Sequence, residues 1–288
     1  MKNNFDINYK KEINFFINNA IKEDLNSIDH SSKASLSKND KGKAVLIVKE
    51  NCVIAGLELA EIIYKKYDSK INFRYLVNDG DKINAGTKGF IVEGNSLSIL
   101  AMERLVLNCI QRMSGIASLT SRYKKIISKT SCKLLDTRKT TPNFRYPEKW
   151  AVLIGGGNNH RMGLYDALMI KDNHIDFGGG VNLVLEKTKR YLSGLGKEYD
   201  LIVETRNLKE VKDVLNYNIV TRILLDNMDI NEIKKALSLI GNKKPTEASG
   251  NIDKSNILAI AKTGVNFISL GCLTHSAKPI DISLKVSK

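Results

Sequence analysis

Six short apolar runs, the first near residue 133, constrain the fold of this chain more than any other feature of its sequence. The last four recur about every 22 residues, which is the spacing of successive β-α units joined by short crossovers. Helical segments lie between the runs, and Asn207–Glu210 and Asp229–Glu232 carry capping signals. The pattern predicts parallel strands covered by helices, and equal units in series favour a barrel over an open sheet. The six runs are Lys133–Asp136, Ala167–Ile170, Leu201–Val203, Ile223–Leu225, Pro245–Ala248 and Phe267–Leu270.

Polar or glycine residues follow each of these runs. Because parallel strands end on one rim of a barrel, where such folds carry their active sites, we expect these residues to meet in a single site. They are Thr137, Arg138 and Lys139 after the first run, Lys171 after the second, Glu204 after the third, Asp226 after the fourth, Ser249, Gly250 and Asn251 after the fifth, and Gly271 after the sixth.

The first third of the chain has a different, mixed pattern. Helical and strand-like segments follow each other there without an internal repeat, which predicts an α+β domain. The expected elements are a helix over 8–25, a polar loop over 27–43, a strand at 44–48, a helix at 59–67, strands near 73–77 and 89–93, and a long helix over 97–118.

The composition is that of an ordinary globular protein, with 288 residues, 42% hydrophobic and 26% charged. No apolar run is long enough to cross a membrane, and the polar N-terminus does not resemble a secretory signal. The four cysteines are widely scattered, which indicates reduced thiols in a cytosolic protein. We therefore expect a cytoplasmic protein.

The formal net charge of +14 is divided unevenly between lysine and arginine. Lysines are spread along the chain, as on a solvated surface, whereas six of the ten arginines lie between residues 104 and 161. A nucleic-acid-binding protein is an alternative explanation of the charge, but basic tracts and aromatic-basic motifs are absent from the sequence. The clustered guanidinium groups instead indicate a carboxylate or phosphate site.

The expected rim contains a cationic group and a smaller acidic group. Bringing many cations together raises the free energy unless the ligand is anionic, so we expect a substrate with several negative charges. Glu204 and Asp226, on neighbouring strands, suit hydrated Mg²⁺ or sugar hydroxyls, and ion pairs with the cations are the alternative. The glycines that follow the last two strands allow main-chain N–H groups to approach a phosphate. The cationic group is Arg138, Lys139, His160, Arg161 and Lys171.

Several longer motifs occur in an order that resembles the quinolinate phosphoribosyltransferase family, also called nicotinate-nucleotide pyrophosphorylase (carboxylating). The resemblance covers most of the chain and weakens before about residue 40. The motifs are Glu103–Asn108, Ser114–Ala117, Asp136–Pro142, Gly155–Leu164, Ile170–Ile175, Val203–Glu204, Leu225–Asn227, Glu247–Gly250 and Gly271–Ser276.

This resemblance implies an α/β fold and a particular reaction. The fold is an incomplete (β/α) barrel of about six parallel strands in residues 116–276, plus an N-terminal α+β sandwich domain in residues 1–115 that the segment 277–288 joins. Quinolinate and phosphoribosyl pyrophosphate would give nicotinate mononucleotide, pyrophosphate and CO2 with Mg²⁺, in NAD synthesis. The family forms homodimers with shared active sites. A related enzyme that acts on another anionic substrate is the alternative.

The resemblance also implies roles for individual residues. Lys139, Lys171, Glu204 and Asp226 would be catalytic, and Glu204 and Asp226 would engage the ribose and Mg²⁺, directly or through water. Arg104 would reach in from the partner subunit. The carboxylates of quinolinate would be held by Arg138, Lys139, His160, Arg161 and Lys171. The remaining substrate-binding residues, mostly around the phosphate, would be Thr137, Ser249, Gly250, Asn251, Leu270, Gly271, Cys272 and His275.

Overall fold

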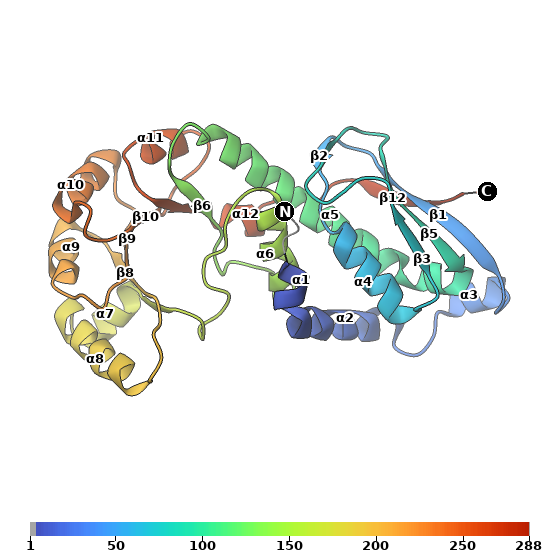
Figure 1. Cartoon of the computed structure of the whole chain (residues 1–288), viewed down its shortest axis with the longest axis horizontal. Coiled ribbons are helices and arrows are strands. Elements are labelled where there is room, and N and C mark those ends of the chain that lie inside the picture. The colour runs from blue at the N-terminus through green and yellow to red at the C-terminus, as the bar shows by residue number, and fades with distance from the viewer. Residues whose placement is uncertain (1–3, 288) are drawn as a thin grey trace. The chain divides into compact units, whose positions relative to one another are not determined.

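The computed structural model describes residues 4–287, and the chain divides into two compact units (Figure 1). The first unit comprises Met1–Arg122, Lys139–Gly157 and Cys272–Lys288, and the second comprises Tyr123–Arg138 and Asn158–Gly271. These limits differ from the expected domains 1–115 and 116–276, because residues 139–157 pack with the first unit. Arg112 pairs with Glu148 there, with 2.9 Å between Nη2 and Oε1.

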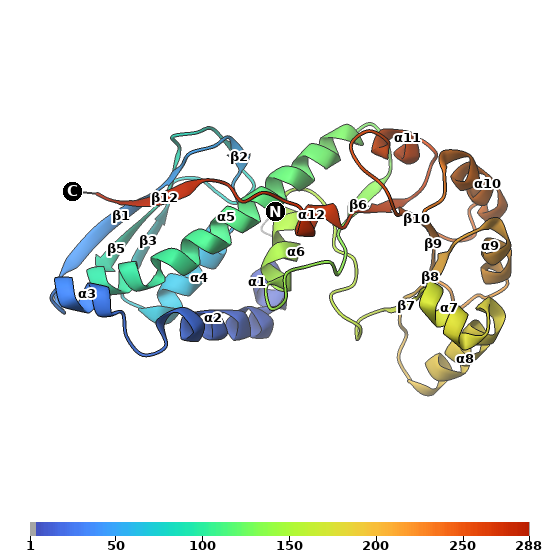
Figure 2. The ribbon, with the colours of Figure 1, turned by 180° about the vertical axis from the view of Figure 1, so that it is seen from behind.

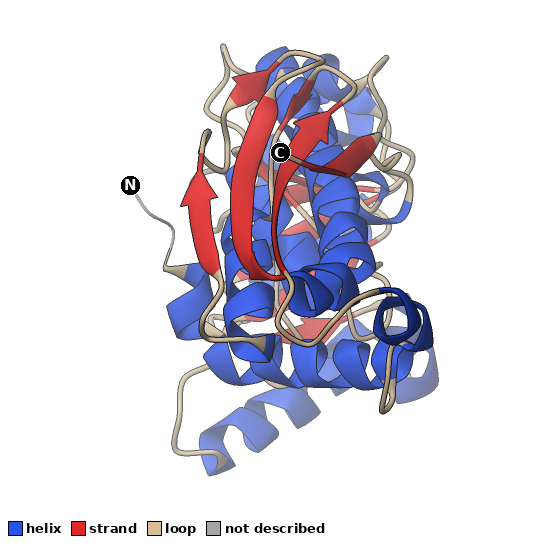
Figure 3. Ribbon diagram, turned by 90° about the vertical axis from the view of Figure 1, so that its right-hand side faces the viewer, coloured by secondary structure: helices blue, strands red, loops and turns tan. Residues whose placement is uncertain are grey.

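The first unit is built on a four-stranded sheet in the order β12-β1-β5-β3, whose paired strands are antiparallel. The strand nearest the C-terminus pairs with β1, so the segment 277–288 contributes to this sheet (Figures 2 and 3). A second, two-stranded sheet pairs β2 with β4. The strands are β1 (Lys41–Val48), β2 (Cys52–Val53), β3 (Asn72–Tyr75), β4 (Lys82–Ile83), β5 (Lys88–Asn95) and β12 (Ile282–Val286).

The core of this unit forms between the sheet and its helices. Leu46, Ile63 and Tyr64 are fully buried, and the rings of Phe73 and Phe90 lie 4.4 Å apart between centroids. The helices are α1 (Phe5–Asn8), α2 (Lys10–Leu25), α3 (His30–Ser35), α4 (Leu57–Tyr67), α5 (Ser96–Ile126), α6 (Arg145–Ile154) and α12 (Cys272–His275).

Most expected elements of the first third are confirmed, but the expected loop over 27–43 is wrong. That segment contains α3 and the first residues of β1. The Asp29 carboxylate accepts the main-chain N–H of Ser32 at 3.1 Å and caps α3. A single polar turn of helix has no apolar periodicity, which explains why the sequence pattern does not reveal it. The long helix α5 also continues eight residues beyond Ser118, its expected end.

The second unit contains the expected parallel sheet, in the order β6-β11-β10-β9-β8-β7. All five neighbouring pairs are parallel, and within the described residues no strand ladder joins the edge strands β6 and β7. The α/β fold with an incomplete barrel is therefore confirmed. The strands are β6 (Lys133–Leu135), β7 (Leu168–Ile170), β8 (Leu201–Thr205), β9 (Arg222–Asp226), β10 (Thr246–Ser249) and β11 (Phe267–Ser269).

Helices connect these strands, as the apolar spacing predicts. The capping signal at Asp229 is confirmed, since its carboxylate accepts the N–H of Glu232 while Glu232 accepts the N–H of Asp229. Asn207 caps the preceding helix, but Glu210 bonds to the N–H of Arg206 instead of returning to Asn207. The helices are α7 (Asp172–Gly178), α8 (Val181–Gly194), α9 (Leu208–Leu215), α10 (Ile230–Ile240) and α11 (Ile257–Ala261).

Throughout residues 4–287, no helix combines the length and the apolar character that crossing a membrane requires.

Candidate active site

Two carboxylates and a lysine meet where β7, β8 and β9 end. Lys171 directly follows β7, and its Nζ lies 3.2 Å from Oε2 of Glu204 near the end of β8. Asp226 is the last residue of β9. Burial raises the pKa of Glu204, and Asp226 and Asp172 raise it further while Lys171 opposes them. The carboxylates of Glu204 and Asp226 are thus close enough to repel each other, which agrees with their predicted positions on adjacent strands.

Two arginines of the second unit, Arg138 and Arg161, interact with each other. Arg138 follows β6, and Arg161 is half-buried with Nη1 donating to the main-chain oxygen of Ala167 at 3.0 Å. Burial lowers the pKa of Arg161, and the charge of Arg138 lowers it further, while Asp166 acts in the opposite direction. An anion bound beside both guanidinium groups would relieve this repulsion.

The turn that carries Arg161 is tied to the end of β6 by a buried carboxylate. Asp136 accepts the main-chain N–H of His160 at 2.8 Å and the side-chain amide of Asn159 at 2.6 Å. The main-chain N–H of Asn158 donates to the oxygen of Leu134 at 2.8 Å, so the turn runs alongside β6. Two motifs that are separate in the sequence, Asp136–Pro142 and Gly155–Leu164, therefore form one structure.

A second buried carboxylate, Glu247 in β10, lies against His160. The distance from His160 Nε2 to Glu247 Oε2 is 3.5 Å, and Arg222 Nη1 lies 2.9 Å from the same oxygen. Sequence reasoning missed Glu247 and Arg222 as site residues, because they lie within strands and not after them. The available signal was a charged residue inside a predicted strand, which requires a partner when it is buried.

The loops after β9 and β10 are locked together by an unusual backbone geometry. Gly250 has a φ of +90°, and a Cβ there would lie 2.2 Å from the Asn227 side-chain oxygen. The N–H of Asn227 donates to the oxygen of Ser249 at 2.8 Å, and the Asn251 amide donates to the Asn227 side chain at 3.0 Å. Only glycine fits at position 250 without displacing this loop.

Four of the expected site residues lie in the first unit. Arg104 is exposed on α5, and Lys139 opens the segment that continues to residue 157. Cys272 and His275 lie on the short helix α12, where Thr274 donates to the main-chain oxygen of Lys139 at 2.7 Å. The roles of all these residues stay predictions. The expected residues in the second unit are Thr137, Arg138, His160, Arg161, Lys171, Glu204, Asp226, Ser249, Gly250, Asn251, Leu270 and Gly271.

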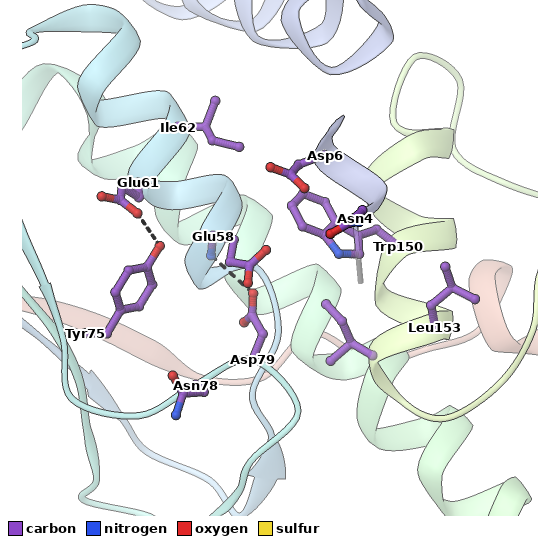
Figure 4. Close-up of a pocket in the computed structure, with 11 residues that line it drawn as sticks. Asn4, Asp6, Glu58, Glu61, Ile62, Tyr75, Asn78, Asp79, Trp150 and Leu153 are labelled. Carbon is purple, nitrogen blue, oxygen red and sulfur yellow. Dashed lines mark hydrogen bonds between the residues drawn. The ribbon is translucent and has the colours of Figure 1, made fainter. Parts of the chain in front are cut away.

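A cavity of about 850 Å³ in the first unit has the wrong charge for an anionic substrate. Carboxylates of Glu58, Glu61 and Asp79 line it beside the Trp150 indole (Figure 4). The expected site residues do not line it. Size alone would favour this cavity, but the arginine-bearing strand ends have the charge that the sequence predicts.

Comparisons with known proteins agree with the motifs. Residues 29–114 match the family Quinolinate phosphoribosyl transferase, N-terminal domain, and residues 116–285 match its C-terminal domain. The chain is 44% identical over 282 residues to quinolinate phosphoribosyltransferase (decarboxylating) 2b, mitochondrial, of Nicotiana tabacum, covering 93% of this chain and 80% of that protein. It is 38% identical over 269 residues to a probable nicotinate-nucleotide pyrophosphorylase (carboxylating) of Synechocystis, covering 92% and 89%.

A solved structure agrees over nearly the whole length. The nicotinate-nucleotide pyrophosphorylase of Francisella tularensis matches with a TM-score of 0.86 and 38% identity, over 96% of each chain. Since both domains and the whole chain are matched, the chain belongs to the quinolinate phosphoribosyltransferase family.

Proposed function

We propose that this chain transfers the phosphoribosyl group of phosphoribosyl pyrophosphate to quinolinate, with loss of CO2, in NAD biosynthesis. The family membership supports the reaction. The structural observation that carries it is the proximity of Arg138 to the half-buried Arg161 at the strand ends. Two guanidinium groups held close together suit a dianion such as quinolinate, because each can bind a carboxylate with two parallel hydrogen bonds.

Different residues at the strand ends bind the two substrates. Arg138 and Arg161 bind the carboxylates of quinolinate, and Lys171 lies across the sheet beside Glu204. Ser249, Gly250 and Asn251 surround the phosphate, where the glycine leaves room for close approach to the main chain. In this proposal Lys139, and Arg104 from a partner subunit, add cationic charge.

Glu204 and Asp226 act on the sugar. The pyridine nitrogen attacks the anomeric carbon while the bond to pyrophosphate breaks, through a state with positive charge on the ribose ring. The two carboxylates hold the ribose hydroxyls and stabilise that charge. In the nucleotide, the bond to the adjacent carboxylate then breaks, its electron pair enters the pyridinium ring, and a solvent proton replaces CO2. Arg138 and Arg161 keep the ring oriented during both steps.

Mg²⁺ fits the same pair of carboxylates. Protein sites for Mg²⁺ commonly offer one or two carboxylates, with water and substrate phosphates as the other ligands. Glu204 and Asp226 lie on adjacent strands, and burial first and the charge of Asp226 in addition raise the pKa of Glu204, so that a cation would stabilise its charged form. The ion would neutralise charge on the departing pyrophosphate.

We also propose a homodimer in which Arg104 completes the partner's site. Arg104 is exposed on α5, so its side chain is available to another subunit. Mixing Arg104→Ala with Arg138→Ala tests this, because hybrid dimers contain one intact site and should recover activity. Verified heterodimers without any recovery would rule out the sharing of sites. The four free cysteines support a cytoplasmic location, which fractionation of cells would test.

The decisive assay mixes the pure protein with quinolinate, phosphoribosyl pyrophosphate and Mg²⁺ and follows nicotinate mononucleotide and CO2. Nicotinate in place of quinolinate should give little product, because it lacks the second carboxylate. Equal turnover of the two acids would contradict the decarboxylating reaction, and turnover of a different acid alone would favour a related phosphoribosyltransferase.

A further inference from the structure

The buried carboxylate of Glu247 is not among the expected substrate ligands, yet it lies against one of them. We propose that Glu247 is a positioning residue that holds His160 as the neutral Nε2–H tautomer, and that this ring holds the main chain at Arg161 in the orientation that binds the anionic substrate. The part that concerns the substrate rests on the proposed function. The part that concerns the tautomer does not.

Glu247 is built into the sheet as an anion with cationic and polar partners. Its side chain is inaccessible to solvent, and Arg222 Nη1 lies 2.9 Å from Oε2. The Arg222 guanidinium also stacks on the Phe267 ring at 4.2 Å from the centroid, which keeps it in place. Burial raises the pKa of Glu247, but the nearby side chains of His160, Ser269 and Arg222 outweigh burial and hold it below its usual range.

The hydrogen bonds of His160 define which ring nitrogen carries the proton. Nδ1 accepts the main-chain N–H of Arg161 at 2.8 Å, so Nδ1 must present a lone pair. The remaining proton lies on Nε2, which faces the Glu247 carboxylate at 3.5 Å. With this arrangement of protons the ring is neutral in the proposal. An imidazolium would lose the bond to Arg161, because both nitrogens would then be donors.

This ring connects Glu247 to the substrate ligand. The Arg161 main chain is held through Nδ1, and the Arg161 guanidinium is held by the oxygen of Ala167. The residues before and after Arg161 are also held, because Asp136 accepts the N–H of His160 and Asp166 accepts the N–H of Met162. Loss of the Glu247 contact would let the ring turn or carry its single proton on Nδ1, and either change removes the restraint that Nδ1 places on the Arg161 main chain.

The tautomer can be measured without any substrate. In full-length protein labelled with ¹⁵N-histidine, two-bond ¹H–¹⁵N correlations distinguish the Nδ1–H, Nε2–H and doubly protonated rings. The chain has four histidines, and His160→Asn identifies the signal of residue 160 by its loss. We expect a single Nε2–H form at neutral pH in the wild-type protein. An Nδ1–H ring or an imidazolium there would overturn the proposal, and the tautomer itself is read in the wild-type protein.

Kinetics test the connection to Arg161. Glu247→Gln can turn either its oxygen or its amide towards Nε2, so the tautomer is no longer fixed. We expect about a tenfold rise in KM for quinolinate, with kcat and KM for phosphoribosyl pyrophosphate within about threefold of wild type. His160→Asn preserves an acceptor near Nδ1 and should be affected less than His160→Gln, whose amide lies near Nε2.

The matched control is Thr246→Val in the same strand. Thr246 is also buried, but its hydroxyl donates to Asn266 at 3.0 Å and not to His160. This variant should lower Tm without changing KM for quinolinate. If Glu247→Gln lowers Tm as Thr246→Val does and leaves both KM and the His160 tautomer unchanged, Glu247 is only structural and the proposal is wrong. If another acid proves to be the substrate, the proposed function fails, but the tautomer result stands by itself.

Discussion

Two carboxylates, the half-buried Asp79 in the first unit and the fully buried Glu247 in the second, have pKa values shifted in opposite directions. Burial raises the pKa of Asp79 to about 6, although the N–H groups of Leu57 and Glu58 donate to it. Glu247 is buried more completely, yet its pKa lies below the usual range because His160, Ser269 and Arg222 surround it. The polar partners of a carboxylate, and not the depth of its burial alone, therefore decide in which direction its pKa shifts.

The surroundings of Asp79 and Glu247 also differ in charge. Asp79 lines the cavity of about 850 Å³ together with other carboxylates (Figure 4). Glu247 lies in the sheet whose strand ends carry Arg138, Arg161 and Lys171. An anionic substrate would be repelled by the first region and attracted by the second. Four experiments test whether the acidic cavity and the strand ends differ in this way.

The largest effect is expected from removing a cation of the strand-end site. Arg161→Ala should lower kcat/KM for quinolinate by about 10²- to 10³-fold, since a charged hydrogen-bonding group that contacts the substrate contributes about 3–4 kcal/mol. Glu58→Ala, in the acidic cavity, should leave kcat/KM within about twofold. Steady-state kinetics measures both values. Comparable decreases of kcat/KM in the two variants would contradict the assignment of the substrate site to the strand ends.

Glu247→Leu should lower the free energy of unfolding by about 3–5 kcal/mol at pH 7, because it leaves Arg222 without its buried partner. The pKa of Glu247 is lowered in the folded state, so its contribution is present above the unfolded pKa and is lost as the pH falls through the folded value. Urea unfolding should therefore show a smaller difference from wild type in acid. A difference that grows in acid would contradict the assigned charge.

Asp79→Asn should have the opposite sign. The folded pKa of Asp79 is raised to about 6, so its contribution to stability is present below the unfolded pKa and is lost as the pH rises through about 6. Asparagine still accepts the N–H groups of α4 without a charge. We expect about 1–2 kcal/mol more stability than wild type at pH 8 and no difference near pH 4. Asp81→Asn, at an exposed position of the same loop, is the control; an equal gain there would remove the role of burial.

The smallest effect concerns a hydrogen bond at the edge of the cavity. The Tyr75 hydroxyl donates to Glu61 at 2.5 Å, and Lys65 also pairs with Glu61. Tyr75→Phe should lower the free energy of unfolding by about 1 kcal/mol, because Glu61 keeps access to water and to Lys65. If Tyr75→Phe lowered the free energy of unfolding as much as Glu247→Leu, the polar contacts of the cavity would contribute as much to stability as the buried pair of Glu247 and Arg222.

Much of the second unit could be predicted from regular spacing. Runs starting at Leu201, Ile223, Pro245 and Phe267 predicted four adjacent strands, and the residues after them were placed at one edge of the sheet. Prediction was weaker where no periodicity exists. The short helix α3 is polar, and residues 139–157 pack with the first unit through the Arg112–Glu148 pair. Pairs of this kind join residues far apart in the chain, so local patterns do not contain them.

Strand periodicity and motif order are local properties of the chain, so the parallel sheet, the family and many of the residues near the strand ends could be inferred from the sequence alone. The partners of those residues could not. Asp136 follows β6 and Glu247 lies inside β10, yet folding brings both to His160, where Asp136 accepts its N–H and Glu247 faces its ring. These residues are far apart in the chain, and the state of a charged group depends on the atoms within a few ångströms of it, which folding alone brings together.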